Sequence, residues 1–72
     1  MNTQRMKIFE YALLWHPSQK QQKEEGQKTK LLVEPKWMLA PDEKTALMAA
    51  AMEIPKEHRE ELEQVEIAVR AF

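Results

Sequence analysis

The residues of this chain that could do chemistry are few and widely spaced. His58 and Glu61 stand three residues apart in a charged segment, a spacing that puts two metal ligands on one helical face. No further ligand follows at a matching distance, so a solvated pair is the better interpretation. His16 precedes Pro17 with nothing to pair with in a general-acid role, and the only serine, Ser18, has no base at motif distance.

Composition removes further classes of site. A single glycine excludes phosphate-cradling loops and dinucleotide fingerprints, which need several glycines at fixed spacing. The absence of cysteine excludes disulfides and thiolate zinc sites, and it is compatible with the cytoplasm. No apolar run approaches the roughly 18 residues of a membrane span, and the N-terminus lacks the core of a signal peptide. We therefore expect a cytoplasmic protein that is not an enzyme and holds no metal or cofactor.

The remaining candidate residues suit binding. Tryptophan is the residue most enriched at binding hot spots, so either tryptophan is expected to be a core side chain or, where partly exposed, an anchor for a partner. The lysines near the middle of the chain either keep a polar segment soluble or reach toward nucleic acid or an acidic protein groove. Judged by exposure and charge, the predicted partner-binding residues are Arg5, Lys7, Trp15, Lys20, Lys23, Lys28, Lys30 and Trp37.

Charge is distributed unevenly along the 72 residues. Residues 1–39 carry seven basic and four acidic side chains, a net +3, whereas residues 40–72 carry four basic and eight acidic, a net −4. This polarity suits docking on a mixed-charge protein surface better than wrapping a nucleic acid, although solvated faces can also segregate in so short a chain. The length allows one domain, residues 1–72, with a thin core.

Arg5–Trp15 is the stretch around which the other elements are expected to be arranged. It first alternates at Met6, Lys7 and Ile8 and then becomes apolar at every position over 12–15. A strand that is apolar on both faces expects cover from two directions. The pattern therefore predicts the central strand of a small sheet, with a partner strand on each edge.

Two segments follow this strand. Pro17–Lys28 contains no large apolar residue, so it is predicted to be a mobile hairpin loop, in which a helical turn over Gln19–Glu25 closed by a left-handed Gly26 is compatible with the composition. Thr29–Leu39 is predicted to be an edge strand, because Pro35 cannot donate into a ladder. Its core-facing side chains are expected to be Leu31, Val33, Trp37 and Leu39.

The second half of the chain is expected to supply helices and a last strand. A helix begins near Asp42 and runs to about Glu53, and a short charged helical turn follows over Pro55–Leu62. Gln64–Phe72 alternates as a strand. The helix stripe expected against the sheet is Leu47, Ala50, Ala51 and Ile54, and the inward residues of the last strand are Val65, Ile67, Val69 and Ala71.

The element order β-β-α-β fixes the predicted architecture. The hairpin makes the first two strands antiparallel, and a right-handed crossover places the third strand on the free side of the first. We therefore predict an α+β fold with a three-stranded sheet in the order 2-1-3, and with the helix and the helical turn on one face. Residues 1–4 are expected to form a flexible tail.

The chain also resembles a small protein carried by tailed bacteriophages, over the segments FEYALLWHP, KLLVEP, LAPDEKTALMAAA and QVEIAVRAF and the polar stretch after the first of them. Among such proteins it is most similar to the short phage transcription regulator that binds the host's multisubunit RNA polymerase. The resemblance implies a monomer in the host cytoplasm that docks on the β and β′ subunits and displaces σ at promoters. It also implies antitermination as an outcome, with nucleic acid met only through the polymerase.

Two alternatives stay open at this stage. A phage anti-defence protein would sequester a nucleotide signal in a homo-oligomer, but it needs a pocket of phosphate-binding arginines, and Arg5, Arg59 and Arg70 are scattered along the chain. A virion decoration or assembly subunit is the third class. Oligomeric state separates these classes, because the polymerase binder is expected to be a monomer and the other two are expected to be oligomers.

Overall fold

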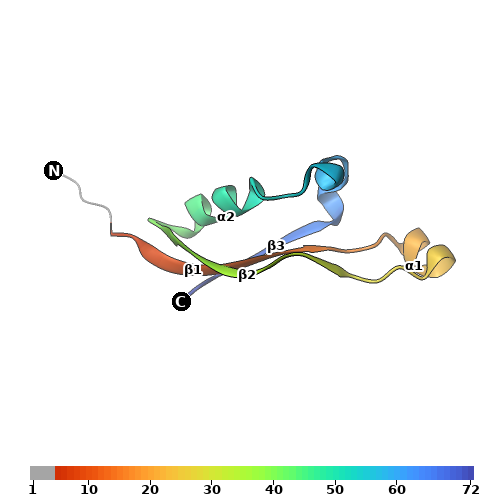
Figure 1. The fold of residues 1–72 in the computed structure, drawn as a ribbon, viewed down its shortest axis with the longest axis horizontal. Coiled ribbons are helices and arrows are strands. Elements are labelled where there is room, and N and C mark those ends of the chain that lie inside the picture. Colours follow the sequence, from red (N-terminus) through yellow and green to blue (C-terminus); the bar gives the residue numbers. More distant parts are fainter. Residues whose placement is uncertain (1–4) are drawn as a thin grey trace.

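The fold is organised around β1 (Lys7–Trp15), which has a hydrogen-bonded neighbour along both edges (Figure 1). The computed structural model describes residues 5–72, so the tail predicted over residues 1–4 lies outside the described residues. β2 (Lys30–Ala40) and β3 (Val65–Ala71) both run antiparallel to β1, and the sheet order is β2-β1-β3. The predicted α+β class and the 2-1-3 order are therefore confirmed.

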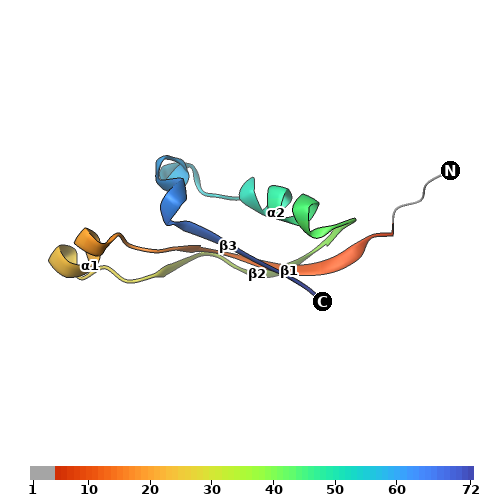
Figure 2. The same ribbon diagram turned by 180° about the vertical axis from the view of Figure 1, so that it is seen from behind.

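Within residues 5–72, one face of the sheet is covered and the other is not (Figure 1). α2 (Glu43–Ala51) and the 3-10 segment η1 (Lys56–Gln64) lie on a single side of it, whereas the helix between β1 and β2 stands at the end of the hairpin (Figures 1 and 2). Accordingly, every second residue of β1 is buried, from Phe9 to Trp15, whereas the residues between them are partly or fully exposed. The prediction of cover from two directions was wrong. The apolar Ala12 and Leu14 owe their partial burial to strands on both edges, and no second layer lies over them.

We call the uncovered side of the sheet the open face. β2 presents different residues to it than the sequence predicted: Leu31, Trp37 and Leu39 lie on the open face, while Met38 and Ala40 lie on the covered one. The reason is the pairing with β1, in which Leu31, Trp37 and Leu39 stand opposite Leu14, Glu10 and Ile8, the residues that alternate with the buried ones of β1. Of the predicted core-facing residues of β2 only Val33 faces the core, opposite Leu13, because a register shift on each side of it exchanges the two faces locally. Pro35 stands inside the first of these shifts.

The segment between β1 and β2 is largely helical. α1 (Gln19–Glu25) begins with a capping box, in which the Ser18 hydroxyl accepts from the Gln21 N–H and the Gln21 side chain accepts from the Ser18 N–H. It ends at Gly26, whose φ of 63° is the left-handed conformation that glycine adopts without strain. The helical turn that the composition allowed is thus present at the end of the hairpin.

α2 (Glu43–Ala51) and the 3-10 segment η1 (Lys56–Gln64) form the covering layer. Asp42 caps α2 by accepting from the Thr45 N–H at 2.7 Å. The buried stripe is Ala46 and Ala50, continued by Ile54, and Leu47 is 37 % exposed, so the predicted stripe was wrong at that position. Residues four apart on a helix share a ridge, and the two alanines let the backbone approach the sheet closely.

The core is thin and lies entirely between the sheet and this layer. Leu13 is its one large side chain with no exposed surface, and it packs beside Tyr11, Ala50 and Ile54. The predicted inward residues of β3 do contribute, because Val65, Ile67 and Val69 pack against this cluster. In residues 5–72, no helix has the length and apolar character needed to cross a membrane.

Candidate binding face

The open face is built by the register of the three strands. In this register, Ile8 lies opposite Leu39, and Glu10 lies between Trp37 on one neighbour and Arg70 on the other. Because successive side chains of a strand point to opposite faces, these residues share the side away from α2. The open face therefore carries a mixture of large apolar and charged side chains, and no other described element lies over it (Figures 1 and 2).

Several of its apolar side chains gather at one end, whereas Leu31 lies at the other. We call Ile8, Trp37, Leu39 and Phe72 the Trp37 cluster. The ring of Trp37 meets the ring of Phe72 edge to face, with 5.2 Å between centroids and 71° between planes, a favourable geometry for aromatic pairs. Both residues nonetheless remain exposed to solvent, Trp37 to 67 % and Phe72 to 73 %. A shallow apolar hollow of about 290 Å³ opens between Ile8, Trp37, Met38 and Leu39.

Charged groups border the cluster along β1 and β3. Arg70 Nε donates to Glu10 Oε1 at 2.7 Å, across the strand pair. Beyond this ion pair, a groove of about 430 Å³ runs over the small side chains of Ala12 and Ala68 toward Glu66. An exposed apolar patch beside fixed charges has the anatomy of a protein interface, with an apolar centre and a polar rim.

His16 lies at the far end of the open face and has partners that the sequence did not reveal. Its Nε2 is 2.6 Å from Glu66 Oε1, and its Nδ1 is 3.0 Å from Thr29 Oγ1. Thr29, His16 and Glu66 thus stand in the order of a nucleophile, a base and an acid. All three side chains are exposed, whereas such chemistry works in a site that excludes water. We interpret these three side chains as a set of hydrogen bonds that joins the ends of the three strands.

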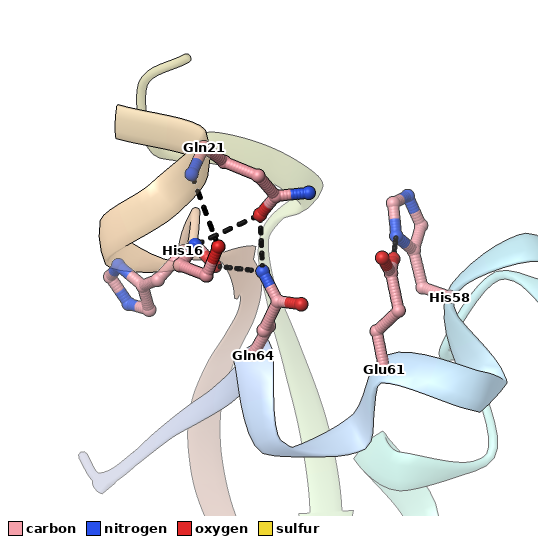
Figure 3. A network of polar contacts seen from close by, with 6 residues as sticks. His16, Gln21, His58, Glu61 and Gln64 are labelled. Atoms are coloured by element: carbon pink, nitrogen blue, oxygen red, sulfur yellow. Dashed lines mark hydrogen bonds and ion pairs between the residues drawn. The ribbon is translucent and has the colours of Figure 1, made fainter. Parts of the chain in front are cut away.

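A second set of contacts holds α1 against the C-terminal part of the chain (Figure 3). Gln64 Nε2 donates both to the His16 carbonyl at 2.9 Å and to Gln21 Oε1 at 2.8 Å. Gln21 Oε1 also accepts the Ser18 N–H of the capping box. The start of α1 is therefore tied to the junction of η1 and β3, which are distant in sequence.

The two tryptophans have opposite environments. Trp15 is 3 % exposed, and its ring lies beneath Lys30 Nζ, which is 5.2 Å from the centroid, and beside His58 at 6.1 Å. Its indole Nε1 is buried without a hydrogen-bond partner. Trp15 is thus a core residue and cannot anchor a partner from this position, so the predicted anchor is retained only for Trp37.

The predicted basic residues do not form one surface. Lys20 and Lys23 lie on α1, and Lys28 follows it, at one end of the hairpin. Arg5 and Lys7 lie at the other end of β1, a separation of roughly 30 Å for a nine-residue strand. Lys30 belongs to the covering of Trp15. The structure therefore brings together Lys20, Lys23 and Lys28, which we call the α1 lysines, but separates them from Arg5, Lys7 and Trp37.

The remaining sequence candidates stay isolated. His58 Nδ1 and Glu61 Oε1 lie 3.3 Å apart within η1 (Figure 3). Within residues 5–72, three or more His, Asp or Glu side chains do not gather at a point where they could hold a metal ion. The residues that sequence reasoning missed are Ile8, Leu39 and Phe72 as surface residues. Strict alternation from a buried Phe9 was the signal that would have placed Ile8 on the outside.

Comparison with protein-family models, with curated proteins and with solved structures gave no match.

Proposed function

We propose that this protein is a non-enzymatic binding module that docks on another protein through the open face of its sheet. The observation that carries the proposal is the Trp37 cluster. Four large apolar side chains, two of them aromatic and in contact, are left in solvent by a chain whose core is otherwise small. Tryptophan in such a position is the most common hot spot of protein interfaces.

The charges around the cluster support a protein partner. Glu10 and Arg70 are fixed to each other by their hydrogen bond, so they present an ordered pair of opposite charges beside the apolar surface. Fixed rim charges give specificity and speed to association more than affinity. The α1 lysines, at the far end of the hairpin, add a second positive region that can steer an acidic surface toward the molecule.

The partner that we propose is the host's multisubunit RNA polymerase. The support for this identity is the resemblance of the sequence to the phage transcription regulator, which implies docking on β and β′, displacement of σ and work in the bacterial cytoplasm. The elongated shape, with extents of 57 × 21 × 15 Å, allows the Trp37 cluster and the α1 lysines to contact separate regions of a large enzyme.

The open face fits this function better than it fits nucleotide sequestration. A pocket for a nucleotide signal needs arginines that converge on its phosphates. Here Arg5 precedes β1, Arg59 lies in η1, and Arg70 is engaged with Glu10 on β3. None of these observations favours the virion-subunit alternative over a polymerase binder.

A transcription assay tests the proposal. Added to purified host RNA polymerase holoenzyme, the wild-type protein should lower initiation from σ-dependent promoters or raise readthrough at terminators. Trp37→Ala should lose most of this effect while Met52→Ala, which removes another exposed apolar side chain from the opposite side of the molecule, should keep it. An equal response to both variants, or no response to the wild-type protein, would refute the proposal.

A further inference from the structure

The outer edge of β3 carries backbone N–H and C=O groups that no described strand pairs with. β3 ends the sheet order β2-β1-β3, so it bonds β1 on one side only. At its two ends, the His16 N–H donates to the Gln64 carbonyl at 2.7 Å and the Phe72 N–H donates to the Ile8 carbonyl at 3.0 Å. An antiparallel ladder bonds every second residue. The N–H and C=O groups of Ile67, Val69 and Ala71 therefore point away from β1, toward solvent.

The other edge of the sheet is protected. Pro35 removes a donor from β2, and the two register shifts bend that strand. β3 has neither device, since it contains no proline and pairs with β1 in unbroken register from Phe9–Ala71 to Trp15–Val65. Of the two edges described, β3 is the one suited to accept another strand.

The sequence of this edge is complementary to itself. In an antiparallel pair of two β3 strands centred on Ala68, Glu66 of each copy lies opposite Arg70 of the other. Ile67 lies opposite Val69 in the same register, so the outward N–H and C=O groups of these residues meet each other and can bond. Glu66 and Arg70 then fall on the pairs without hydrogen bonds, where facing side chains approach most closely.

We propose that the occupant of this edge is a second copy of the chain, which pairs through β3 to form a continuous six-stranded sheet with two-fold symmetry. The charged groups have donors and acceptors to spare for it. Arg70 uses Nε for Glu10 and keeps its terminal nitrogens, while its side chain is 75 % exposed. Glu66 uses Oε1 for His16 and is 54 % exposed, so its second oxygen can accept from Arg70 of the other copy.

Such a dimer goes beyond the proposed function and departs from the monomer that the resemblance implies. The pairing uses the edge of the sheet, so it leaves the Trp37 cluster of each copy uncovered. Both open faces lie on the same side of the joined sheet, because facing residues of an antiparallel pair point to the same side. The dimer would thus present two copies of the proposed binding face to one partner surface and gain from their linkage.

Sedimentation equilibrium tests the dimer. Over about 1 to about 200 μM, wild-type protein should shift from the 8.5 kDa monomer toward twice that mass. Glu66→Arg and Arg70→Glu each place like charges opposite one another twice per dimer, so each should raise the dissociation constant at least about tenfold. An equimolar mixture of these two variants should dimerise again, because the arginine pair of one chain faces the glutamate pair of the other.

The mixing arm separates the proposal from simple damage, because both variants lose their own contacts to Glu10 or His16 whether or not a dimer exists. A matched edge variant, Ala71→Pro, removes an outward N–H at an exposed residue without touching the β1 ladder, so it should stay folded by circular dichroism while its dimer weakens. Wild-type protein that stays monomeric over the whole range overturns the proposal, and so does a dimer that the single charge variants do not weaken. Binding of RNA polymerase through Trp37 is measured in a separate assay, so a failure of the proposed function does not affect the interpretation of the sedimentation result.

Discussion

Trp37 and Phe72 meet edge to face at 5.2 Å across the open face of the sheet, although one belongs to the edge strand β2 and the other directly follows β3. Their contact spans the central strand β1, since Trp37 stands opposite Glu10 and the Phe72 N–H donates to the Ile8 carbonyl. Two exposed aromatic rings from opposite edges of a sheet thereby form one apolar surface with Leu39. This surface is the basis of the function that we propose.

The two tryptophans should respond in opposite ways to truncation. Trp37→Ala should change the free energy of unfolding by less than about 1 kcal/mol, because the ring is largely solvated, and should weaken partner binding by about 2 kcal/mol. Trp15→Ala should instead cost about 3–5 kcal/mol of stability, as for other buried aromatic residues. Urea denaturation of both variants measures this difference, and a large loss of stability in Trp37→Ala would show that its ring belongs to the core.

Leu13→Ala should be among the most damaging core substitutions. Leu13 is fully buried on the central strand β1, so its truncation should cost about 2–4 kcal/mol, enough to unfold much of so small a domain. In wild-type protein, the amides of Phe9–Leu13 should exchange with solvent more slowly than those of α1, since they bond inside the sheet. Slowest exchange in β2 would contradict the central role of β1.

The loss of stability at alkaline pH should depend on Tyr11. A hydrogen bond from its hydroxyl to Glu53, with burial and the charge of Glu53, raises the pKa of Tyr11 from 10.0 to about 12. A raised pKa in the folded state means that the unfolded chain releases this proton first. The contribution of Tyr11 to the free energy of unfolding is therefore fully present below about pH 10 and is lost as the pH rises toward 12. Tyr11→Phe should be less stable at neutral pH and should lose this alkaline decline, as denaturation at several pH values would show.

The α1 lysines should control the rate of association with the proposed partner. Replacing Lys20, Lys23 and Lys28 by glutamate should slow association about tenfold and flatten its salt dependence, because long-range attraction is lost while the Trp37 cluster is intact. The matched control reverses Lys44, Lys56 and Arg59, which lie on the covering layer. Stopped-flow or biosensor kinetics at two ionic strengths measure both sets. Equal slowing in the two would reduce the effect to net charge.

Much of the fold was readable from the sequence because local chemistry determined it. The length and two-sided apolarity of β1 placed it at the centre, Pro35 placed β2 at an edge, and Asp42 and Gly26 marked helix ends. The side-chain direction of β2 could not be predicted, since it is set by the pairing of this strand with β1. The same pairing, which sets Trp37 opposite Glu10, leaves its ring in solvent.

The contacts of the candidate face were also beyond reach of the sequence. His16 and Glu66 are 50 residues apart and Glu10 and Arg70 are 60 apart, so only the strand register brings them together. The sequence identified the basic residues, but it did not show whether they share one surface. In the fold, the length of β1 separates Arg5 and Lys7 from the α1 lysines. The partner identity still depends on the sequence resemblance, and it stays a prediction.

Binding of purified host core RNA polymerase by wild-type protein and by Trp37→Ala tests the central claim most directly. The wild-type protein should bind with a dissociation constant in the micromolar range or below, and Trp37→Ala should bind about 30-fold more weakly with an unchanged fold. σ should compete with the wild-type protein for the same polymerase. A folded wild-type protein that does not bind at micromolar concentration, or a Trp37→Ala variant that binds as well as the wild type, would contradict the account.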